Sequence, residues 1–552
     1  MKSLFWLAIL SFTCISCNND SVEIDPTTVF RYNEHANITS LDPAFSKDQR
    51  NIWACNLIYN GLVKLDNDLE VVPDLADSWL VSDDGLKYSF ILKEGIYFHE
   101  NTAFKAEKGS LSQADSTKTT NSKPSSKKNE KVTAADFKYA LERLTDPNIA
   151  SPGSWVMGNV STITAISKKE LVIELKQPFP AFLGLLTMKY CSVIPDVNRL
   201  NADYDQRSNP IGTGPFYKKR WEENVKLVLR RNSNYHEIDD EGKPLPYLEA
   251  VAITFKNDKQ SEFLEFAQGN LDFINALDPS YKDELLTTQG ELKPAYVSSV
   301  NMIKAPFLNT EYLGLQLDSK TPELQSLKLR TAINLGFDRK QMIKYLRNNI
   351  GTPANSGFIP AGLPAGGKIT GYEYDPSLAR KLVSEYKQET GDENPQVTIS
   401  TNANYLDLCE YIQKELDKVG IKVDIDVMPP STLRQARSAG QLDVFRSSWI
   451  ADYPDAENYL SLFYSKNFSP NGPNYTHFSD PAYDALYEQA LSNPNSKERQ
   501  KLYVQMDSLI IARAAIIPLY YDQSVRFISK KVHGLGTNGI NILDLTRVYK
   551  TN

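Results

Sequence analysis

The stretch from residue 397 to residue 427 constrains the fold more than any other part of the chain. It opens with a short β-type run, Val397-Thr398-Ile399, and closes with apolar residues that alternate with charged ones over 421–427. Between these runs, apolar residues recur at the spacing of an amphipathic helix: Leu408, Ile412, Leu416 and Val419. Gly420 comes next, as glycine commonly does at a helix C-terminus. A strand, a helix and a strand in this order predict a parallel βαβ unit, and therefore an α/β fold.

Further elements can be predicted from the same periodicities. The segments 324–337 and 496–514 have the apolar spacing of helices. Asp338 is expected to cap the helix after it, with Gln341 completing a capping box. Residues 516–528 are rich in β-branched and aromatic side chains, and they predict a pair of strands or an edge strand.

The size and charge of the chain limit the classes of protein to which it can belong. With 552 residues, of which 41% are hydrophobic and 11% aromatic, it can bury a large core and should divide into two or more lobes. The formal net charge of −7 argues against a nucleic-acid-binding surface, because such surfaces carry excess positive charge. No nucleic-acid partner is therefore expected.

The first residues predict export from the cytoplasm. Lys2 precedes an apolar run that is shorter than the roughly 20 residues of a membrane-spanning helix, so residues 1–16 are predicted to be a signal peptide. The segment from Cys14 to Cys17 resembles a bacterial lipoprotein processing box, in which small residues precede the cysteine that receives the lipid. The pattern prefers Leu where Cys14 stands, and an ordinary secretory signal is the alternative.

Residues 105–131 differ from the rest of the chain in composition. They are dominated by Lys, Ser and Thr, and Leu111 is the only large aliphatic residue among them. Such a segment cannot bury enough apolar surface to offset the entropy lost on ordering. A disordered insertion is therefore predicted.

The cysteines predict thiols rather than a disulfide framework. If Cys17 carries lipid, three cysteines remain in the mature chain: Cys55, Cys191 and Cys409. An odd number permits at most one disulfide. Because Cys55 lies in an apolar run and Cys409 on a predicted helix face, buried free thiols are expected.

Residue patterns typical of catalysis or metal binding are not found in the sequence. The five histidines are scattered, and none forms a metal-ligand motif with another histidine or a cysteine. There is no nucleophile elbow and no phosphate loop, and Gly212-Thr213-Gly214 is interpreted as a turn into a strand because Pro215 comes next. No catalytic residue, metal or cofactor is predicted, and the chain is not expected to be an enzyme.

The stretch SSWIADYPDAENYL, residues 447–460, brings three carboxylates close to aromatic side chains. A structural interpretation is a turn, because the residue before Pro454 is held out of the helical region and Asp455 can cap the segment after it. A functional interpretation is a receptor for a cation or an amine, in which a carboxylate binds the charge and Trp449 covers the apolar part of the ligand. The stretch alone leaves both interpretations open.

Nine stretches, taken in order, resemble the solute-binding proteins of peptide-type ABC importers, the family 5 proteins that include oligopeptide- and dipeptide-binding members. These stretches are LIYNGLVKLD (57–66), PDLADSWLVSDDGLKYSFILKEGIYFHE (73–100), VTAADFKYALERLTDP (132–147), NPIGTGPF (209–216), LPYLEAVAITF (245–255), LKLRTAINLGFDRKQMI (327–343), GYEYDPSLARKLV (371–383), WIADYPDAENYL (449–460) and FSDPAYDALYEQAL (478–491). Each stretch is weak alone, but their order and spacing are specific and cover nearly the whole mature chain.

This resemblance implies an α/β fold of two hinged lobes, the type II periplasmic-binding-protein fold with an extra subdomain, and a ligand enclosed between the lobes. It divides the chain into a signal peptide (1–16), a lipidated tether (17–26), lobe one (27–65, 206–304 and 521–552), an extra subdomain with the insertion (66–205) and lobe two (305–520).

The resemblance also assigns ligand-binding residues. In oligopeptide-binding members, the Asp of a Trp-x-x-Asp turn holds the α-ammonium of the peptide, and the matching positions here are Trp449 and Asp452. Two family arginines that can meet the peptide carboxylate correspond to Arg446 and Arg437. The alternative for Arg437 is a helix-end position without contact to a ligand.

The function implied is a receptor that binds short peptides and delivers them to the transmembrane subunits of an ABC importer. The receptor is expected to be an extracytoplasmic monomer, held at a membrane by lipid on Cys17. The alternatives are a binder of another solute with the same fold, such as a metal chelate, haem or a saccharide, and, third, a hydrolase.

The lipid anchor gives a first prediction. Cys17→Ala should move the protein from the membrane to the soluble extracytoplasmic fraction, because stable anchoring requires two or more acyl chains at about 0.8 kcal/mol per buried CH₂. Fractionation and subsequent immunoblotting measure this change. Cys14→Leu, which restores the family pattern, should leave the protein on the membrane, and a Cys17→Ala protein that also stays there would place the anchor elsewhere.

Overall fold

The computed structural model describes residues 25–105, 130–201, 204–276, 278 and 281–552. The predicted signal peptide, Cys17 and nearly all of the predicted insertion lie outside the described residues. Within the described part, no helix is long and apolar enough to cross a membrane.

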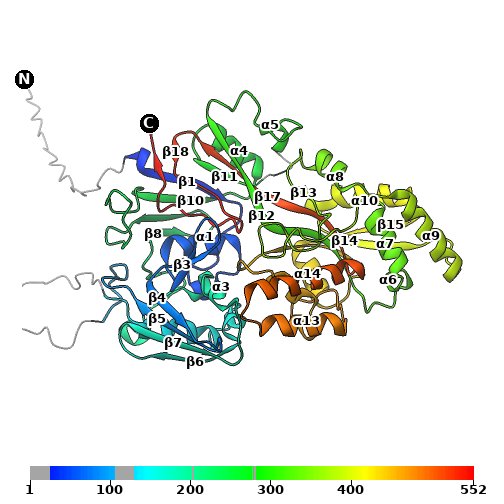
Figure 1. Cartoon of the computed structure of the whole chain (residues 1–552). Helices are drawn as coiled ribbons and strands as arrows, with labels where there is room; N and C mark the ends of the chain where they lie inside the picture. The colour runs from blue at the N-terminus through cyan, green and yellow to red at the C-terminus, as the bar shows by residue number, and fades with distance from the viewer. Residues whose placement is uncertain (1–24, 106–129, 202–203, 277, 279–280) are drawn as a thin grey trace, which may run out of the picture.

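The centre of the molecule is one mixed sheet of eleven strands that runs through both halves (Figure 1). In spatial order the strands are β15 (Lys422–Val427), β14 (Gln396–Thr401), β16 (Val444–Ile450), β12 (Val300–Leu315), β17 (Ile516–Ser529), β11 (Phe273–Asn275), β1 (Val29–Glu34), β10 (Ala250–Phe255), β9 (Lys226–Arg231) and β8 (Phe216–Glu222), while β13 (Thr352–Pro353) pairs with β17. Two short pairs lie beside this sheet: β2 (Val63–Leu65) with β3 (Val71–Pro73), and β18 (Val532–His533) with β19 (Tyr549–Lys550).

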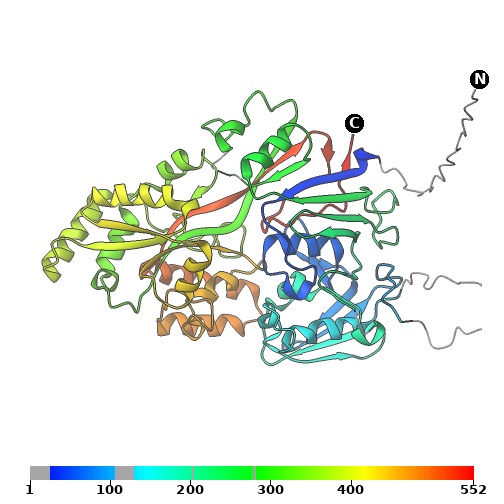
Figure 2. The ribbon, with the colours of Figure 1, turned by 180° about the vertical axis from the view of Figure 1, so that it is seen from behind.

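Helices cover this sheet in both halves. The first half carries α1 (Gln49–Ile58), α4 (Lys259–Ala267) and α5 (Lys282–Leu285). The second half carries α6 (Pro322–Gln325), α7 (Leu327–Leu335), α8 (Arg339–Leu346), α9 (Pro376–Thr390), α10 (Leu406–Asp417), α11 (Pro430–Ser438), α12 (Glu457–Leu460), α13 (Pro481–Leu491) and α14 (Ser496–Ala512). Figure 2, the view from behind, shows the two halves joined across the long strands.

The strands β12 and β17 join the two halves. They pair antiparallel from Val300 opposite Ser529 to Gly314 opposite Ile516, with register shifts in the middle of the ladder. On one side β17 pairs with β11, and on the other side β12 pairs with β16. The expected lobe boundaries, near residues 305 and 520, fall inside these two strands.

One sequence prediction is wrong at this place. Residues 516–528 were expected to form a pair of strands or an edge strand, but they form a single strand in the middle of the sheet. Nearly every side chain of β17 is buried, because the strand is covered on both faces. A strand of this kind shows a continuous apolar run instead of alternation.

The predicted βαβ unit is confirmed. β14 and β15 are parallel, with Val397 opposite Val423, and α10 connects them. The apolar stripe of α10 is buried: Leu408, Ile412 and Leu416. Gly420 has a φ of +89°, a conformation that glycine adopts without steric strain.

The helix predicted after Asp338 is present as α8, but its capping differs from the prediction. The Asp338 side chain accepts hydrogen bonds from the backbone N–H groups of Lys340 and Gln341. The returning bond of a capping box is not formed, since Oε1 of Gln341 has no partner among the described residues. The cap is therefore made by Asp338 alone.

Gly212-Thr213-Gly214 leads into β8, as predicted, through a bend at residues 214 and 215. This segment packs directly against the C-terminal end of α1. A Cβ at Gly212 would lie 2.0 Å from the carbonyl oxygen of Ile58, and one at Gly214 would lie 2.5 Å from the carbonyl carbon of the same residue. Only glycine permits this approach of the two backbones.

An extra subdomain lies at one end of the first half (Figure 1). It contains a four-stranded antiparallel sheet in the order β4 (Ala76–Val81), β5 (Lys87–Leu92), β7 (Glu170–Leu175) and β6 (Val160–Ala165). The helices α2 (Ala134–Glu142) and α3 (Phe182–Leu186) contribute to its core. The most buried side chains of that core include Phe90, Phe137, Leu171 and Ile173.

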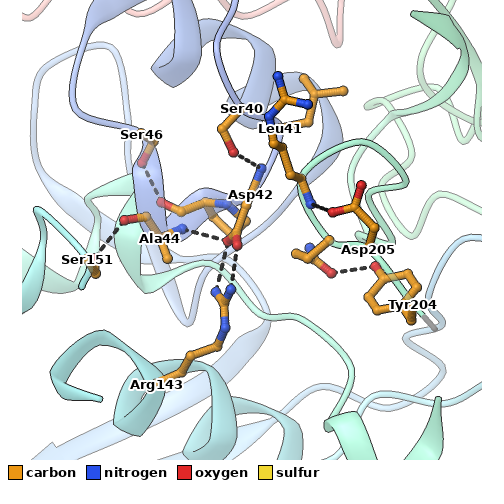
Figure 3. A network of polar contacts seen from close by, with 12 residues as sticks. Ser40, Leu41, Asp42, Ala44, Ser46, Arg143, Ser151, Tyr204 and Asp205 are labelled. Carbon is orange, nitrogen blue, oxygen red and sulfur yellow. Dashed lines mark hydrogen bonds and ion pairs between the residues drawn. The ribbon is translucent and has the colours of Figure 1, made fainter. Parts of the chain in front are cut away.

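A buried ion pair fastens the subdomain to the N-terminal segment of the first half (Figure 3). Arg143, just after α2, donates to both carboxylate oxygens of Asp42, with an Nη1 to Oδ1 distance of 2.9 Å. Asp42 also accepts from the backbone N–H of Ala44, and Ser151 of the subdomain donates to the carbonyl of Ala44. The side chains of Arg143 and Asp42 are only 11% and 4% exposed.

The three cysteines of the described chain are free and buried, as predicted. Burial raises the pKa of the Cys409 thiol to about 11. A thiol with such a pKa is protonated at neutral pH and is a poor nucleophile. These side chains are therefore part of the core.

The ion pair in Figure 3 gives a prediction about stability. Asp42→Asn keeps the hydrogen bond to Ala44 but leaves the Arg143 charge buried without its partner, which should lower the free energy of unfolding by about 3 kcal/mol. Denaturation by urea measures the change. The exposed pair of Arg207 and Glu223, whose side chains are 48% and 50% exposed, is the control, and Glu223→Gln should cost less than about 1 kcal/mol. Equal costs for the two variants would contradict this role of Asp42.

Candidate functional site

A cavity of about 460 Å³ lies between the two halves. Its wall in the first half is formed chiefly by the residues around the start of α1, by residues 187–190 and by the C-terminal loop 538–546. The second half contributes Ile450, Ala451 and Asp452. The volume falls within the range of roughly 300–1,000 Å³ that is typical of small-molecule sites.

Asp452 reaches this cavity because of the strand, turn and helix that carry it. β16 pairs with β12 and ends at Ile450, and α12 begins after the turn. Asn458 of α12 fastens the turn, since its Oδ1 accepts from the indole Nε1 of Trp449 (2.9 Å) and from the backbone N–H of Asp452 (3.1 Å). The carboxylate of Asp452 is left at the surface of the cavity.

The charge of Asp452 is weakly compensated. Among the described residues, its carboxylate accepts a single hydrogen bond, from Nδ2 of Asn458 at a long distance of 3.4 Å. No cationic side chain in the described part of the chain forms an ion pair with it. Asp452 is exposed to the solvent of the cavity, but the protein atoms that surround the carboxyl group raise its pKa to about 6, against the effect of the Asn458 bond. At pH 7 Asp452 is therefore an ionised acid that faces the cavity without a counter-charge.

The other two carboxylates of the turn have structural roles. Asp455 accepts a hydrogen bond from the backbone N–H of Glu457 (2.9 Å), as the turn interpretation predicted. Glu457 is buried and accepts from the hydroxyl groups of Tyr453 and Tyr487. Burial raises the pKa of Glu457 to about 7. Of the three acids, only Asp452 lines the cavity.

Trp449, predicted to cover the ligand, is not part of the cavity wall. Its side chain is half-buried against the hydrophobic cluster that contains Tyr459 and Leu308. The indole N–H is already bonded to Asn458. Trp449 therefore supports the turn that positions Asp452.

The two predicted arginines also lie away from the cavity wall. Arg446 pairs with Glu311 of the neighbouring strand, and its guanidinium carbon lies 3.1 Å from the centre of the Tyr405 ring. Arg437 donates from Nη1 to Oγ of Ser447 at 2.6 Å. Because the buried carboxylate of Glu311 already neutralises Arg446, the charge of Arg446 is not available to a ligand.

Sequence reasoning missed the first-half wall. Lys64, Asp74, Lys189, Tyr190 and Asp544 line the cavity, although no functional motif marked them and they come from separate segments of the chain. They come together only because the subdomain and the C-terminal loop pack against the same side of the first half. No spacing rule connects such residues.

One group of side chains has the composition of a metal site. The ligand atoms of Asp74, His236 and Glu237 lie within 4.8 Å of one another. However, Lys64 forms an ion pair with Glu237. Burial lowers the pKa of His236 against the effect of Asp74 and Glu237, and Lys93 and Lys64 lower it further. The positive charges of Lys64 and Lys93 would repel a divalent cation at this place. Asp74, His236 and Glu237 are therefore not assigned as a metal site.

Comparisons with known proteins agree with a solute-binding site. The chain matches the family model of bacterial extracellular solute-binding proteins, family 5 middle, over residues 70–471. It is 26% identical over 521 residues to a probable di/tripeptide-binding protein 5 of Pseudomonas aeruginosa, with 90% of each chain covered. It is 23% identical over 505 residues to the glutathione-binding protein GsiB of Salmonella typhi, again with 90% of each chain covered.

The fold is shared with a solved structure of the same kind. The periplasmic binding protein DppA from Helicobacter pylori, in complex with the peptide STSA, superposes with a TM-score of 0.76 at 25% identity, over 95% of this chain and 98% of that chain. This likeness confirms the expected two-lobed fold. The Pseudomonas relative and DppA are both named as binding proteins, and DppA is named as a periplasmic one. The chain belongs to the bacterial extracellular solute-binding proteins of family 5, the extracytoplasmic receptors of peptide-type ABC importers.

Proposed function

We propose that this protein binds short peptides in the cavity between its halves and delivers them to the transmembrane subunits of an ABC importer. The observation that carries the proposal is the Asp452 carboxylate, which is ionised at pH 7 and has no cationic partner in the described part of the chain. The α-ammonium of a peptide would supply the missing charge and three N–H donors. The receptor works as a monomer that is anchored by lipid on Cys17, which lies outside the described residues.

The rest of the cavity suits a ligand with variable side chains. Five aromatic residues contribute to its wall: Trp53, Tyr59, Tyr190, Tyr235 and Phe307. Aromatic surfaces accept many apolar groups, and water in a cavity of this size can fill the space that a small side chain leaves. The names of two relatives, a di/tripeptide-binding protein and a peptide complex of DppA, support the same ligand class.

The ligand class can be tested directly. Protein purified under native conditions and then denatured should release a mixture of short peptides, detected by mass spectrometry. Peptides are expected because a receptor with a wide, aromatic cavity retains those of highest affinity during purification. A single non-peptide solute, such as a metal chelate, haem or a saccharide, would contradict the proposal. Hydrolysis of an added peptide would favour an enzyme.

Asp452→Asn tests the ammonium contact. Removing one partner of a charge pair within a binding site typically costs about 2–5 kcal/mol. The variant should therefore bind peptides with a free amine at least about 30-fold more weakly, at 1.4 kcal/mol per decade, and N-acetylated peptides almost unchanged. Isothermal titration calorimetry on a peptide and its acetylated form measures both effects. Asp426→Asn makes the same charge change at an exposed site on β15, away from the cavity, and should alter neither.

The pH dependence of peptide affinity is a second test of the contact between Asp452 and the α-ammonium group. Because the pKa of Asp452 is raised to about 6, the carboxylate becomes protonated as the pH falls below this value and can no longer pair with an ammonium group. Affinity for the free amine should fall about tenfold per pH unit below 6 in the wild-type protein, and not in Asp452→Asn. Equal losses for acetylated and free peptides, or the same pH profile in the variant, would remove Asp452 from this role.

A further inference from the structure

The first-half wall of the cavity contains a lysine that the proposed ammonium contact does not use. Lys189 lies just after α3, is half-buried and lines the cavity. Its ammonium group forms no ion pair or hydrogen bond with any of the described residues. Lys64 lines the same cavity but differs, because its ammonium group is paired with Glu237.

Two acids of the cavity wall, Asp74 and Asp544, influence Lys189 without forming an ion pair with it, and both accept hydrogen bonds from other groups. Asp74 accepts hydrogen bonds from Nδ2 of Asn60 (3.0 Å) and from the backbone N–H of Gly61 (2.9 Å). Asp544 accepts from the backbone N–H of Thr546 at 2.8 Å. Burial lowers the pKa of Lys189, whereas Asp74 and Asp544 raise it from a distance and Lys64 lowers it. A half-buried cation in such surroundings lacks a direct partner, and burying an unpaired charge is unfavourable.

Lys189 and Asp452 lie on different walls of the same cavity. Asp452 comes from the second half, and Lys189 comes from the subdomain side of the first half. The two groups form no ion pair with each other. Asp452 and Lys189 therefore each present to the cavity a charge that no described residue pairs with, and Lys47, Asp74 and Asp544 line it as well, likewise without an ion pair among the described residues. A molecule with an ammonium group at one end and a carboxylate at the other is complementary to this arrangement.

We propose that Lys189 binds the C-terminal carboxylate of the peptide whose α-ammonium is held by Asp452, so that the cavity selects peptides with both termini free. This inference rests on the proposed peptide function. It assigns the carboxylate contact to a residue of the first half, instead of Arg446, whose charge is taken by Glu311. A ligand held at Asp452 and at Lys189 touches both halves, so each terminus contributes to holding them together around it.

The test compares alanine peptides of two to five residues, each as the free acid and as the C-terminal amide, by isothermal titration calorimetry. These peptides have no side-chain carboxylate, so a difference between acid and amide reports the terminal group. The wild-type protein should bind acids about 30-fold more tightly than amides, which is about 2 kcal/mol at 1.4 kcal/mol per decade. Lys189→Met should lose this preference by weakening the acids about 30-fold and the amides less than about threefold.

Two further variants sharpen the comparison. Lys189→Arg keeps the positive charge and should retain the preference for acids. Lys93→Met removes another half-buried lysine of the same half that does not line the cavity, and it should leave the preference intact. Thermal melting of each variant reports folding, and the acid-to-amide ratio of the wild-type protein needs no variant at all.

The outcomes separate this inference from the proposed function. Wild-type protein that binds acids and amides equally, or a Lys189→Met protein that loses affinity equally for both, overturns the role of Lys189 while peptide binding stands. Loss of the preference in Lys93→Met overturns it as well. Wild-type protein that binds neither form at any length contradicts the peptide function itself.

Discussion

The pairing of β12 with β17 holds the two halves of this protein in one sheet, and the position of the cavity depends on it. The two strands form an antiparallel ladder that continues from one half of the molecule into the other, and each half adds its own strands to one side of it. The ladder is interrupted by register shifts between Pro306 and Thr310, where a strand bends and its side chains are redirected. Phe307, in this irregular stretch, lines the cavity. The cavity thus lies where the shared strands cross between the halves.

Charges that support the architecture differ from charges that face the cavity. Arg143 with Asp42, Arg446 with Glu311, and Arg347 with Asp522 are ion pairs with little exposure, and each pairs groups from distant parts of the chain. Breaking a pair of this kind leaves one charge uncompensated, which is why its partners act as a unit. Asp452 and Lys189 have no such partner among the described residues. A charge left uncompensated in a cavity is better explained by a ligand than by the stability of the fold.

The fold is shared among proteins with different solutes, so the wall of the cavity must decide what is bound. Relatives at 23–26% identity are named as binding glutathione and as binding di- and tripeptides. In this chain, the wall combines a turn from the second half with residues of the first half that no functional motif marked. Changes in those residues would alter the ligand without disturbing the strands that join the halves.

Local patterns along the chain were sufficient to predict several elements and to draw attention to one candidate site residue. Periodicity predicted the βαβ unit of 397–427 and the helix over 496–514, because these depend on local spacing, and the family pattern pointed to Asp452 as a candidate. The remaining assignments required the packed molecule. β17 was misassigned because a strand buried on both faces shows no alternation. The charge of Arg446 is not available to a ligand because Glu311 of the neighbouring strand β12 forms an ion pair with it. Lys189 was recognised because segments far apart in the chain meet at one cavity. Such contacts depend on packing between elements, which local spacing does not encode.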